Sequence, residues 1–187
     1  MEVAPHLSSY TASQRTIERQ RKRKHLPYPN PGNVAEITIP ESLQTPTGGS
    51  NFILWDSGMN DEERILMFGT TENINRLQSS EHWFVDGTFK VAPELFYQVF
   101  TIHALIDSKA VPLIYCLIQD KAEATYSRVL ERIKELRPDL NPSSVMCDFE
   151  KATHNAIQHV FPNAHVAGCL LHLGQCLWRK VQELGLS

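Results

Sequence analysis

The alternation of apolar and polar residues predicts three consecutive strands in the middle of the chain. Residues 82–89 alternate loosely and are rich in aromatic side chains, and residues 97–106 are dense in β-branched and aromatic side chains. Residues 111–118 are almost continuously aliphatic. Short polar segments at 93–94 and 107–109 separate the three runs, and connections of this length favour antiparallel neighbours.

After the third strand the apolar period changes to that of a helix. The residues at helical spacing are Tyr126, Val129, Leu130, Ile133 and Leu136. Asp120 is the predicted N-cap of this helix, and Pro138 ends it. The same pattern predicts four further elements: a strand at 144–149, a helix at 151–160, a strand at 164–169 and a helix from 170 that ends near Gly185. Three strands are therefore followed by helix, strand, helix, strand and helix.

The first half of the chain gives weaker signals. Residues 26–50 contain five prolines and a glycine pair, which predict a linker-like segment with one short strand at 36–39. Three short elements are predicted next: strands at 52–55 and 64–68 and a helix at 72–77 with Thr71 as its N-cap.

The length and composition of the chain allow one core with an appendage. Its 187 residues are 42% hydrophobic, which is enough to fill such a core. We predict three parts: a basic, Pro-rich and largely extended segment at 1–50, an extension at 51–80 that packs on the main sheet, and the main domain at 81–187.

Charge is distributed unevenly along the chain. The net charge is −3, yet residues 1–25 carry six Lys or Arg against two Glu, and the remainder is acidic. The basic run at 16–24 either contacts phosphate as an exposed helix, acts as a nuclear-import signal or is merely solvated. No apolar stretch has the length of a membrane span, and no signal peptide is recognisable, so we expect no membrane partner.

Two predicted strands lead into an aspartate, Asp86 in the first and Asp148 in the fourth. A carboxylate at the end of an apolar strand is costly unless a cation meets it, although aspartates also begin turns and Asp86-Gly87 is a common turn pair. The order βββαβαβα is that of the ribonuclease H-like fold, an α/β fold with a mixed sheet in which the first and fourth strands are neighbours. Neighbouring strands lie about 4.8 Å apart, so we expect Asp86 and Asp148 to form a metal site whose hard oxygens suit Mg²⁺.

Four segments together resemble a known family. They are Asp-Gly-Thr-Phe-Lys at 86–90, Phe-Tyr-Gln-Val-Phe-Thr-Ile-His at 96–103, Cys-Asp-Phe-Glu at 147–150 and Gly-Cys-Leu-Leu-His at 168–172. Through these segments the chain resembles Mutator-like element (MULE) transposases, from about residue 15 to the C-terminus.

The resemblance implies DNA transposition by metal-dependent phosphoryl transfer in a ribonuclease H-like domain with an Asp-Asp-Glu triad. Asp86 matches the first aspartate of the triad and Asp148 the second, while Cys169 and His172 match the Cys-x-x-His signature of the family. The resemblance further implies Mg²⁺ or Mn²⁺ as the cofactor, the DNA of transposon ends as the partner, a homo-oligomer in the transposition complex and a nuclear location.

The third acid of the triad is where the sequence departs from the family. The resemblance places this glutamate beyond a largely helical insertion downstream of the Cys-x-x-His signature, whereas this sequence ends at Ser187. We therefore expect a truncated chain that binds metal weakly and shows little or no DNA cleavage. Glu150 is either a stand-in ligand or a cap of the next helix, and Glu183 is expected to be solvated.

Cysteine usage favours a reducing compartment, because three of the four cysteines lie in apolar runs. Cys169, His172 and Cys176 share one face of the last predicted helix. A zinc site there would need a fourth ligand such as His165 at a spacing unlike that of standard zinc fingers, so we expect no zinc. The other interpretation is that Cys169 and His172 pack inside the domain and fix the last helix against the sheet.

The leading hypothesis is a transposase-derived domain that keeps two aspartates without full strand-transfer chemistry. The alternative is a non-catalytic module that binds nucleic acid or protein and in which the aspartates are vestigial. A self-sufficient ribonuclease would need a further acid, and only Glu150 is placed to supply it. A metal-binding assay separates the first two hypotheses.

Overall fold

The structure of the chain is a computed structural model that describes residues 10–23, 31–45 and 49–186. The chain divides into two compact units, residues 1–31 and 32–187. The predicted boundaries at residues 50 and 80 stay a prediction.

A single helix, α1 (Tyr10–Arg23), is described in the first unit. It contains most of the basic run, and the side chains of Arg15 and Arg19 are exposed. Lys24, which the sequence also assigned to this helix, lies outside the described residues.

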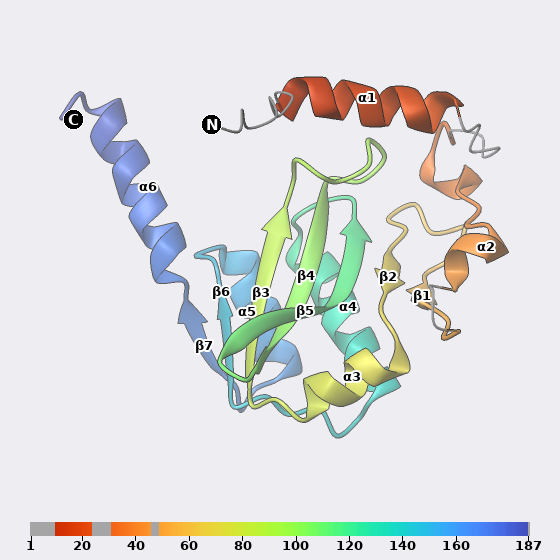
Figure 1. Ribbon diagram of the computed structural model, residues 1–187. Helices are drawn as coiled ribbons and strands as arrows, with labels where there is room; N and C mark the ends of the chain where they lie inside the picture. The colour runs from red at the N-terminus through yellow and green to blue at the C-terminus, as the bar shows by residue number, and fades with distance from the viewer. Residues whose placement is uncertain (1–9, 24–30, 46–48, 187) are drawn as a thin grey trace, which may run out of the picture. The chain divides into compact units, whose positions relative to one another are not determined.

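A mixed sheet runs through the second unit (Figure 1). Its seven strands within the described residues are β1 (Ile53–Asp56), β2 (Leu66–Phe68), β3 (His82–Thr88), β4 (Gln98–Ile106), β5 (Lys109–Ile118), β6 (Ser144–Cys147) and β7 (His165–Gly168). The strand order is β1-β2-β5-β4-β3-β6-β7. The pairs β3–β6 and β6–β7 are parallel, and the other neighbouring pairs are antiparallel. The predicted parallel pairing of the first and fourth long strands is thus confirmed, and the protein is a mixed α/β protein.

Helices follow the strands in the predicted order. The helices described in the second unit are the 3₁₀ helix η1 (Val34–Glu36), α2 (Glu41–Gln44), α3 (Thr71–Gln78), α4 (Glu123–Leu136), α5 (Lys151–Val160) and α6 (Leu170–Glu183). α4 and α5 pack against each other and cover one face of the sheet (Figure 1). None of the helices in the described part of the chain combines the length and apolar character needed to cross a membrane.

The start of β3 is anchored in the core by Trp83. Its buried ring meets the ring of Phe161 edge-on, with centroids 5.3 Å apart. The indole Nε1–H donates to the backbone oxygens of Leu77 at 3.1 Å and Ser80 at 3.0 Å, which satisfies its one polar group. These contacts hold the start of β3 in place, and β3 is the strand that contains Asp86.

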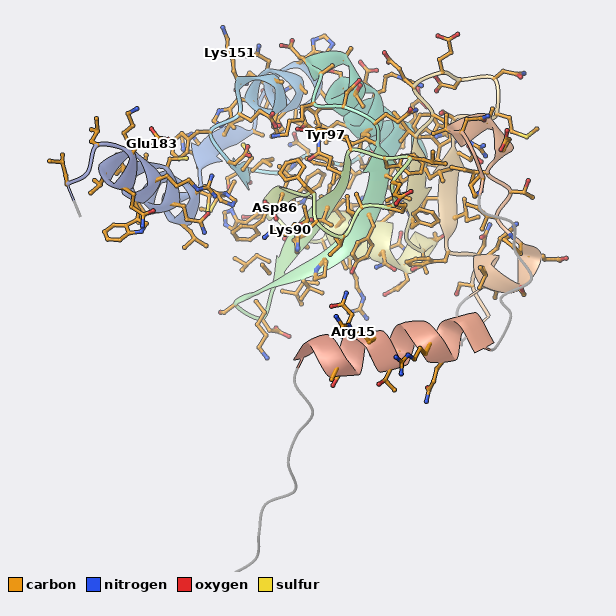
Figure 2. All side chains as sticks on the ribbon, turned by 90° about the horizontal axis from the view of Figure 1, so that it is seen from above. Arg15, Asp86, Lys90, Tyr97, Lys151 and Glu183 are labelled. Atoms are coloured by element: carbon orange, nitrogen blue, oxygen red, sulfur yellow. The ribbon has the colours of Figure 1, made fainter. Side chains whose placement is uncertain are left out.

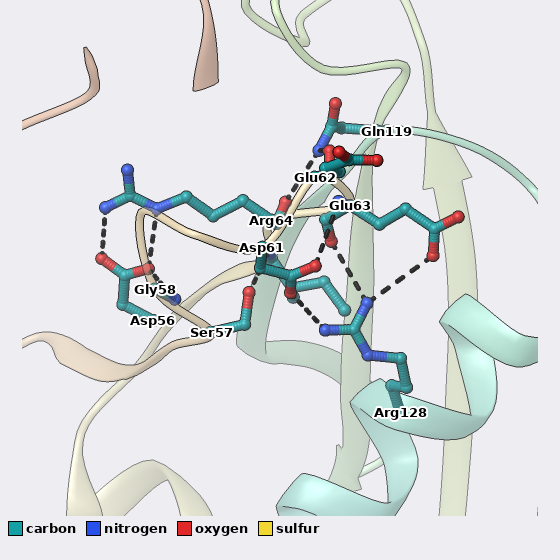
Figure 3. Close-up of polar contacts among 10 residues, drawn as sticks. Asp56, Ser57, Gly58, Asp61, Glu62, Glu63, Arg64, Gln119 and Arg128 are labelled. Atoms are coloured by element: carbon teal, nitrogen blue, oxygen red, sulfur yellow. Dashed lines mark hydrogen bonds and ion pairs between the residues drawn. The ribbon is translucent and has the colours of Figure 1, made fainter. Parts of the chain in front are cut away.

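The connection between β1 and β2 is held by the buried guanidinium of Arg64 (Figure 3). Arg64 makes a bidentate pair with Asp56 through contacts of 2.8 Å and 2.6 Å, and its Nη1 donates to the backbone oxygens of Val34 and Ile37. Bidentate pairs of this kind combine charge with fixed geometry. Arg64 thus joins residues 34–37 to the edge of the sheet. The strand order shows that β1 and β2 are part of the sheet and do not form a separate extension packed on it.

Two predictions in the first half of the chain are wrong in detail. Residues 36–39 form no strand, because the side chain of Asn33 accepts the Glu36 N–H at 3.1 Å and caps the short helix η1. The N-cap of α3 is Thr70 rather than Thr71. Thr70 has the extended backbone of a cap, and its hydroxyl accepts the Asn73 N–H at 3.1 Å.

The predicted cap of α4 is also displaced. The N-cap residue of α4 is Ala122, and Asp120 instead accepts the Ala122 N–H at 2.9 Å in the turn that precedes the helix. The hairpin between β4 and β5 is tighter than predicted, since Asp107 and Ser108 alone form the turn with φ of 48° and 61°. Two consecutive left-handed residues are typical of a type I′ hairpin turn.

The last helix is predicted correctly in position but not in packing. None of the described residues of α6 is buried, and Leu170, Leu177 and Trp178 are exposed. α5 already packs on β6 and β7, the strands that precede α6. Cys169 and His172 are half-buried, and His172 Nε2 lies 3.7 Å from Asp86 Oδ1 of β3, so the interpretation that these two residues fix the helix against the sheet stays a prediction.

Candidate active site

Asp86 lies within β3 and not in a turn. It pairs with Thr101 of β4, whose hydroxyl donates to the backbone oxygen of Asp86 at 3.2 Å. The turn interpretation of Asp86-Gly87 is therefore wrong. The carboxylate is 44% exposed, with the Thr88 hydroxyl 3.5 Å from Oδ2 and His172 Nε2 3.7 Å from Oδ1. Because both contacts are long, the two carboxylate oxygens remain accessible to a ligand.

Asp148 follows the last residue of β6 and begins a turn. The sequence extended this strand to residue 149, but β6 ends at Cys147. The reason is local: Asp148 Oδ1 accepts the Glu150 N–H at 3.2 Å, and His154 Nε2 lies 2.8 Å from the Asp148 backbone oxygen. At Asp148, hydrogen bonds that involve side chains take the place of the backbone bonds of a strand. The turn interpretation therefore holds for Asp148.

The two aspartates nevertheless lie at the same edge of the sheet. In the parallel pair β3–β6, Phe84 is opposite Met146, and each aspartate is two residues further along its own chain. Both line a pocket of about 410 Å³. The other residues that line it are Gly87, Phe89, Lys121, Phe149, Glu150, His172, Gln175, Cys176 and Arg179. Figure 2 shows Asp86 together with Lys90 and Tyr97, which lie in the segment that follows β3.

Glu150 is the N-cap residue of α5, yet its side chain makes no capping hydrogen bond to the helix backbone. Oε2 accepts from the hydroxyls of Tyr126 at 2.8 Å and Thr153 at 3.2 Å. Oε1 pairs with Lys121 Nζ at 3.2 Å. Glu150 thus occupies the predicted cap position without the predicted capping bond, and both of its oxygens already contact protein donors.

The hydrogen bonds of Glu150 continue into the core. Gln98, which is 1% exposed, donates its Nε2–H to the Tyr126 hydroxyl at 2.8 Å and to the Asp120 backbone oxygen at 3.0 Å. Burial raises the pKa of Tyr126 well above its usual range, so the hydroxyl stays protonated and can donate to Glu150. A Cβ at Gly87 would lie 2.1 Å from Gln98 Oε1, so any larger residue displaces this amide.

The thiol of Cys147, the last residue of β6, is not a nucleophile. Burial raises the pKa of Cys147 to about 12, and the negative charge of Asp148 acts in the same direction. The thiolate is the reactive form, so Cys147 stays inert at neutral pH.

The residues that the sequence considered for zinc lie in α6, at its N-cap and at the start of β7. Cys169 is the N-cap residue of α6, while His172 and Cys176 line the pocket, and His165 is exposed at the start of β7. In the part of the chain that the structure describes, no three His, Cys, Asp or Glu side chains gather in a metal-binding arrangement. Glu183, near the end of α6, is exposed and pairs with Lys180 at 2.9 Å.

Residues 82–175 match the family model of the MULE transposase domain, which covers half of the chain. The chain belongs to the MULE transposase family. The match begins at the first residue of β3, includes both aspartates and ends within α6. It confirms the resemblance drawn from the four sequence segments. No match was found among curated proteins.

Sequence reasoning missed the cations of the MULE domain pocket. β5 runs parallel to β3 within the sheet, so residues just after β5 reach the same edge as Asp86, and Lys121 could have been found in this way. Arg179 is seven residues after His172, which places both on one face of α6. The contact of Tyr126 with Glu150 gave no sequence signal, because the two residues come from different elements.

Proposed function

We propose that the MULE domain of this chain is a ribonuclease H-like domain for DNA transposition, in which Asp86 and Asp148 hold a divalent cation at the scissile phosphate. The main support is the position of these two carboxylates at the matching edge of parallel neighbours that line one pocket. Lys121 and Arg179 line the same pocket, and their positive charge can attract and position DNA phosphates.

The donors of the pocket fit Mg²⁺ or Mn²⁺. Asp86 makes only long side-chain contacts, and Asp148 uses Oδ1 for the Glu150 N–H and keeps Oδ2 for a ligand. Hard carboxylate oxygens suit hard cations. When bound, such a cation supplies positive charge for the oxygens of the reacting phosphate. Asp86 and Asp148 hold it in this proposal, and we expect weak binding because two carboxylates are a small ligand set.

Full two-cation chemistry needs a further carboxylate. Glu150 is the nearest candidate in the pocket, but Tyr126, Thr153 and Lys121 hold it, so recruiting it as a ligand costs those contacts. Misplacement of about 1 Å in such a site costs on the order of a hundredfold in rate. Residues 1–187 should therefore bind one cation and DNA while cleaving DNA slowly.

The test combines calorimetric titration of Mn²⁺ with cleavage of transposon-end DNA. Asp86→Asn and Asp148→Asn should each remove the Mn²⁺ site. The matched control is Asp107→Asn, because Asp107 is an exposed aspartate in the hairpin turn at the opposite end of β4. It should bind Mn²⁺ like the wild type. Equal Mn²⁺ binding by all three variants would refute the assignment. Rapid cleavage by residues 1–187 that both site variants abolish would instead make Glu150 the completing ligand.

A second candidate is a non-catalytic module that binds nucleic acid or protein. The observation that favours it is the engagement of Glu150 by Lys121 and Tyr126, which leaves two carboxylates for metal. DNA binding without any Mn²⁺ site would support this candidate over the first. The family implies DNA of transposon ends as the partner, a homo-oligomeric complex and a nuclear location, and the proposed function includes all three.

A further inference from the structure

Two aromatic side chains are exposed beside the acidic pocket. Phe89 and Tyr97 are 44% and 52% exposed, and their ring centroids lie 5.4 Å apart at 69°. We call this pair the aromatic ledge. Phe89 also lines the pocket that contains Asp86 and Asp148. Neither ring belongs to the hydrophobic core, so each keeps apolar ring surface open to solvent.

A cation connects the ledge with the acids. Lys121 Nζ lies 4.5 Å from the centre of the Phe89 ring, and the same ammonium pairs with Glu150 at 3.2 Å. The pocket thus places carboxylates, the ammonium of a flexible lysine side chain and an aromatic ring next to one another. This combination matches a nucleotide, which carries a phosphate at one end and a flat aromatic base at the other.

We propose that the aromatic ledge stacks an unpaired base of the DNA strand whose phosphate lies at Asp86 and Asp148. The inference rests on the proposed function, since the acids fix where the backbone runs. Base stacking on an aromatic side chain tolerates any sequence because every base has a flat face. Inside a duplex the neighbouring base pairs cover both faces of a base, so the ledge selects DNA that is frayed, nicked or single-stranded near the site.

The test uses three fluorescent DNA probes of equal length: a blunt duplex, a duplex with an unpaired tail, and the tailed duplex with 2-aminopurine in the tail. Binding to residues 1–187 is measured in Ca²⁺, which limits cleavage. We expect the wild type to prefer the tailed duplex and to quench the 2-aminopurine. Phe89→Ala and Tyr97→Ala should each weaken tailed-duplex binding by about tenfold and restore the fluorescence, with little change for the blunt duplex.

Two controls separate stacking from general damage. Tyr97→Phe keeps the ring and should bind like the wild type. Val91→Ala removes an exposed apolar side chain of the same segment, one that does not line the pocket, and should also change nothing. Equal losses for blunt and tailed DNA in Phe89→Ala, or 2-aminopurine that stays bright with the wild type, would overturn the stacking proposal alone. A wild type that binds none of the probes would overturn the proposed function as well.

Discussion

Replacing Gly87 by alanine should destabilise the domain far more than replacing Gly168 by alanine. Each new Cβ meets a side chain at a distance that real Cβ atoms essentially never show. At Gly87 the contact is 2.1 Å from Gln98 Oε1, and at Gly168 it is 2.4 Å from ring carbons of Phe149. The two neighbours differ in their freedom to move, because Gln98 is 1% exposed and Phe149 is 54% exposed.

The magnitudes follow from that difference. Gln98 must move by roughly 1 Å, and overpacking of this kind costs about 1–3 kcal/mol. The movement weakens two hydrogen bonds of its amide, to Tyr126 and Asp120, each worth about 0.5–1.5 kcal/mol. Alanine recovers about 0.5–1 kcal/mol through its lower entropy in the unfolded chain. The net loss for Gly87→Ala is about 2–4 kcal/mol. For Gly168→Ala the exposed ring can turn into solvent, so the loss stays below about 1 kcal/mol.

Urea unfolding followed by circular dichroism measures both effects. With a slope of about 1–3 kcal/mol per molar, Gly87→Ala should lower the midpoint by roughly 1–2 M. A double-mutant cycle then identifies the cause: in a Gln98→Ala background the colliding amide is gone, so Gly87→Ala should cost less than about 0.5 kcal/mol. Equal costs for Gly87→Ala and Gly168→Ala, or a cost at Gly87 that persists without the Gln98 amide, would refute the reasoning.

Three further predictions concern other contacts. Arg64→Ala should lower the free energy of unfolding by about 3–5 kcal/mol, since it leaves the half-buried Asp56 without its partner. The hydrogen bond from Arg64 lowers the pKa of Asp56, so this stabilisation is present above the ordinary carboxyl pKa of about 4 and is lost as the pH falls through the lower folded-state value. The gap in stability between the wild type and Asp56→Asn should narrow over that range, and a constant gap would contradict this assignment. Thr70→Ala removes the N-cap of α3 and should lower the free energy of unfolding by about 1 kcal/mol, as measured by thermal or urea unfolding. An unchanged free energy of unfolding would show that the cap does not stabilise the protein. Iodoacetamide at pH 8 should label the exposed Cys176 but not the buried Cys147, which mass spectrometry of the native protein can check.

The succession of strands and helices along the chain was predictable because the apolar runs differ in kind. Alternation, aliphatic density and helical spacing separate β3, β5 and α4 without any tertiary information. The packing of α6 was not predictable, because helical spacing shows which face is apolar and not whether another element covers it. Leu177 has the spacing of a core residue and is 60% exposed.

Some features of the candidate site were predictable from the sequence and others were not. Asp86 and Asp148 were predictable because each follows an apolar run, and the topology places the ends of parallel neighbours together. The end of β6 was not, since a hydrogen bond from the Glu150 N–H to the Asp148 side chain stops the strand two residues early. The engagement of Glu150 by the hydroxyl of Tyr126 depends on a contact between α4 and the start of α5, which no local pattern encodes.

The two short strands before the MULE domain have a practical consequence for anyone who trims the chain to its family match. β2 pairs through Leu66–Phe68 with Tyr115–Leu117, the apolar second half of β5, and β1 shields β2 in turn. Removal of residues 1–81 would leave β5 as an open edge strand with unpaired backbone groups, and such edges recruit other chains. Residues 82–175 alone should therefore be prone to aggregation during expression, because β1 and β2 cover the sheet edge that would otherwise pair with other chains.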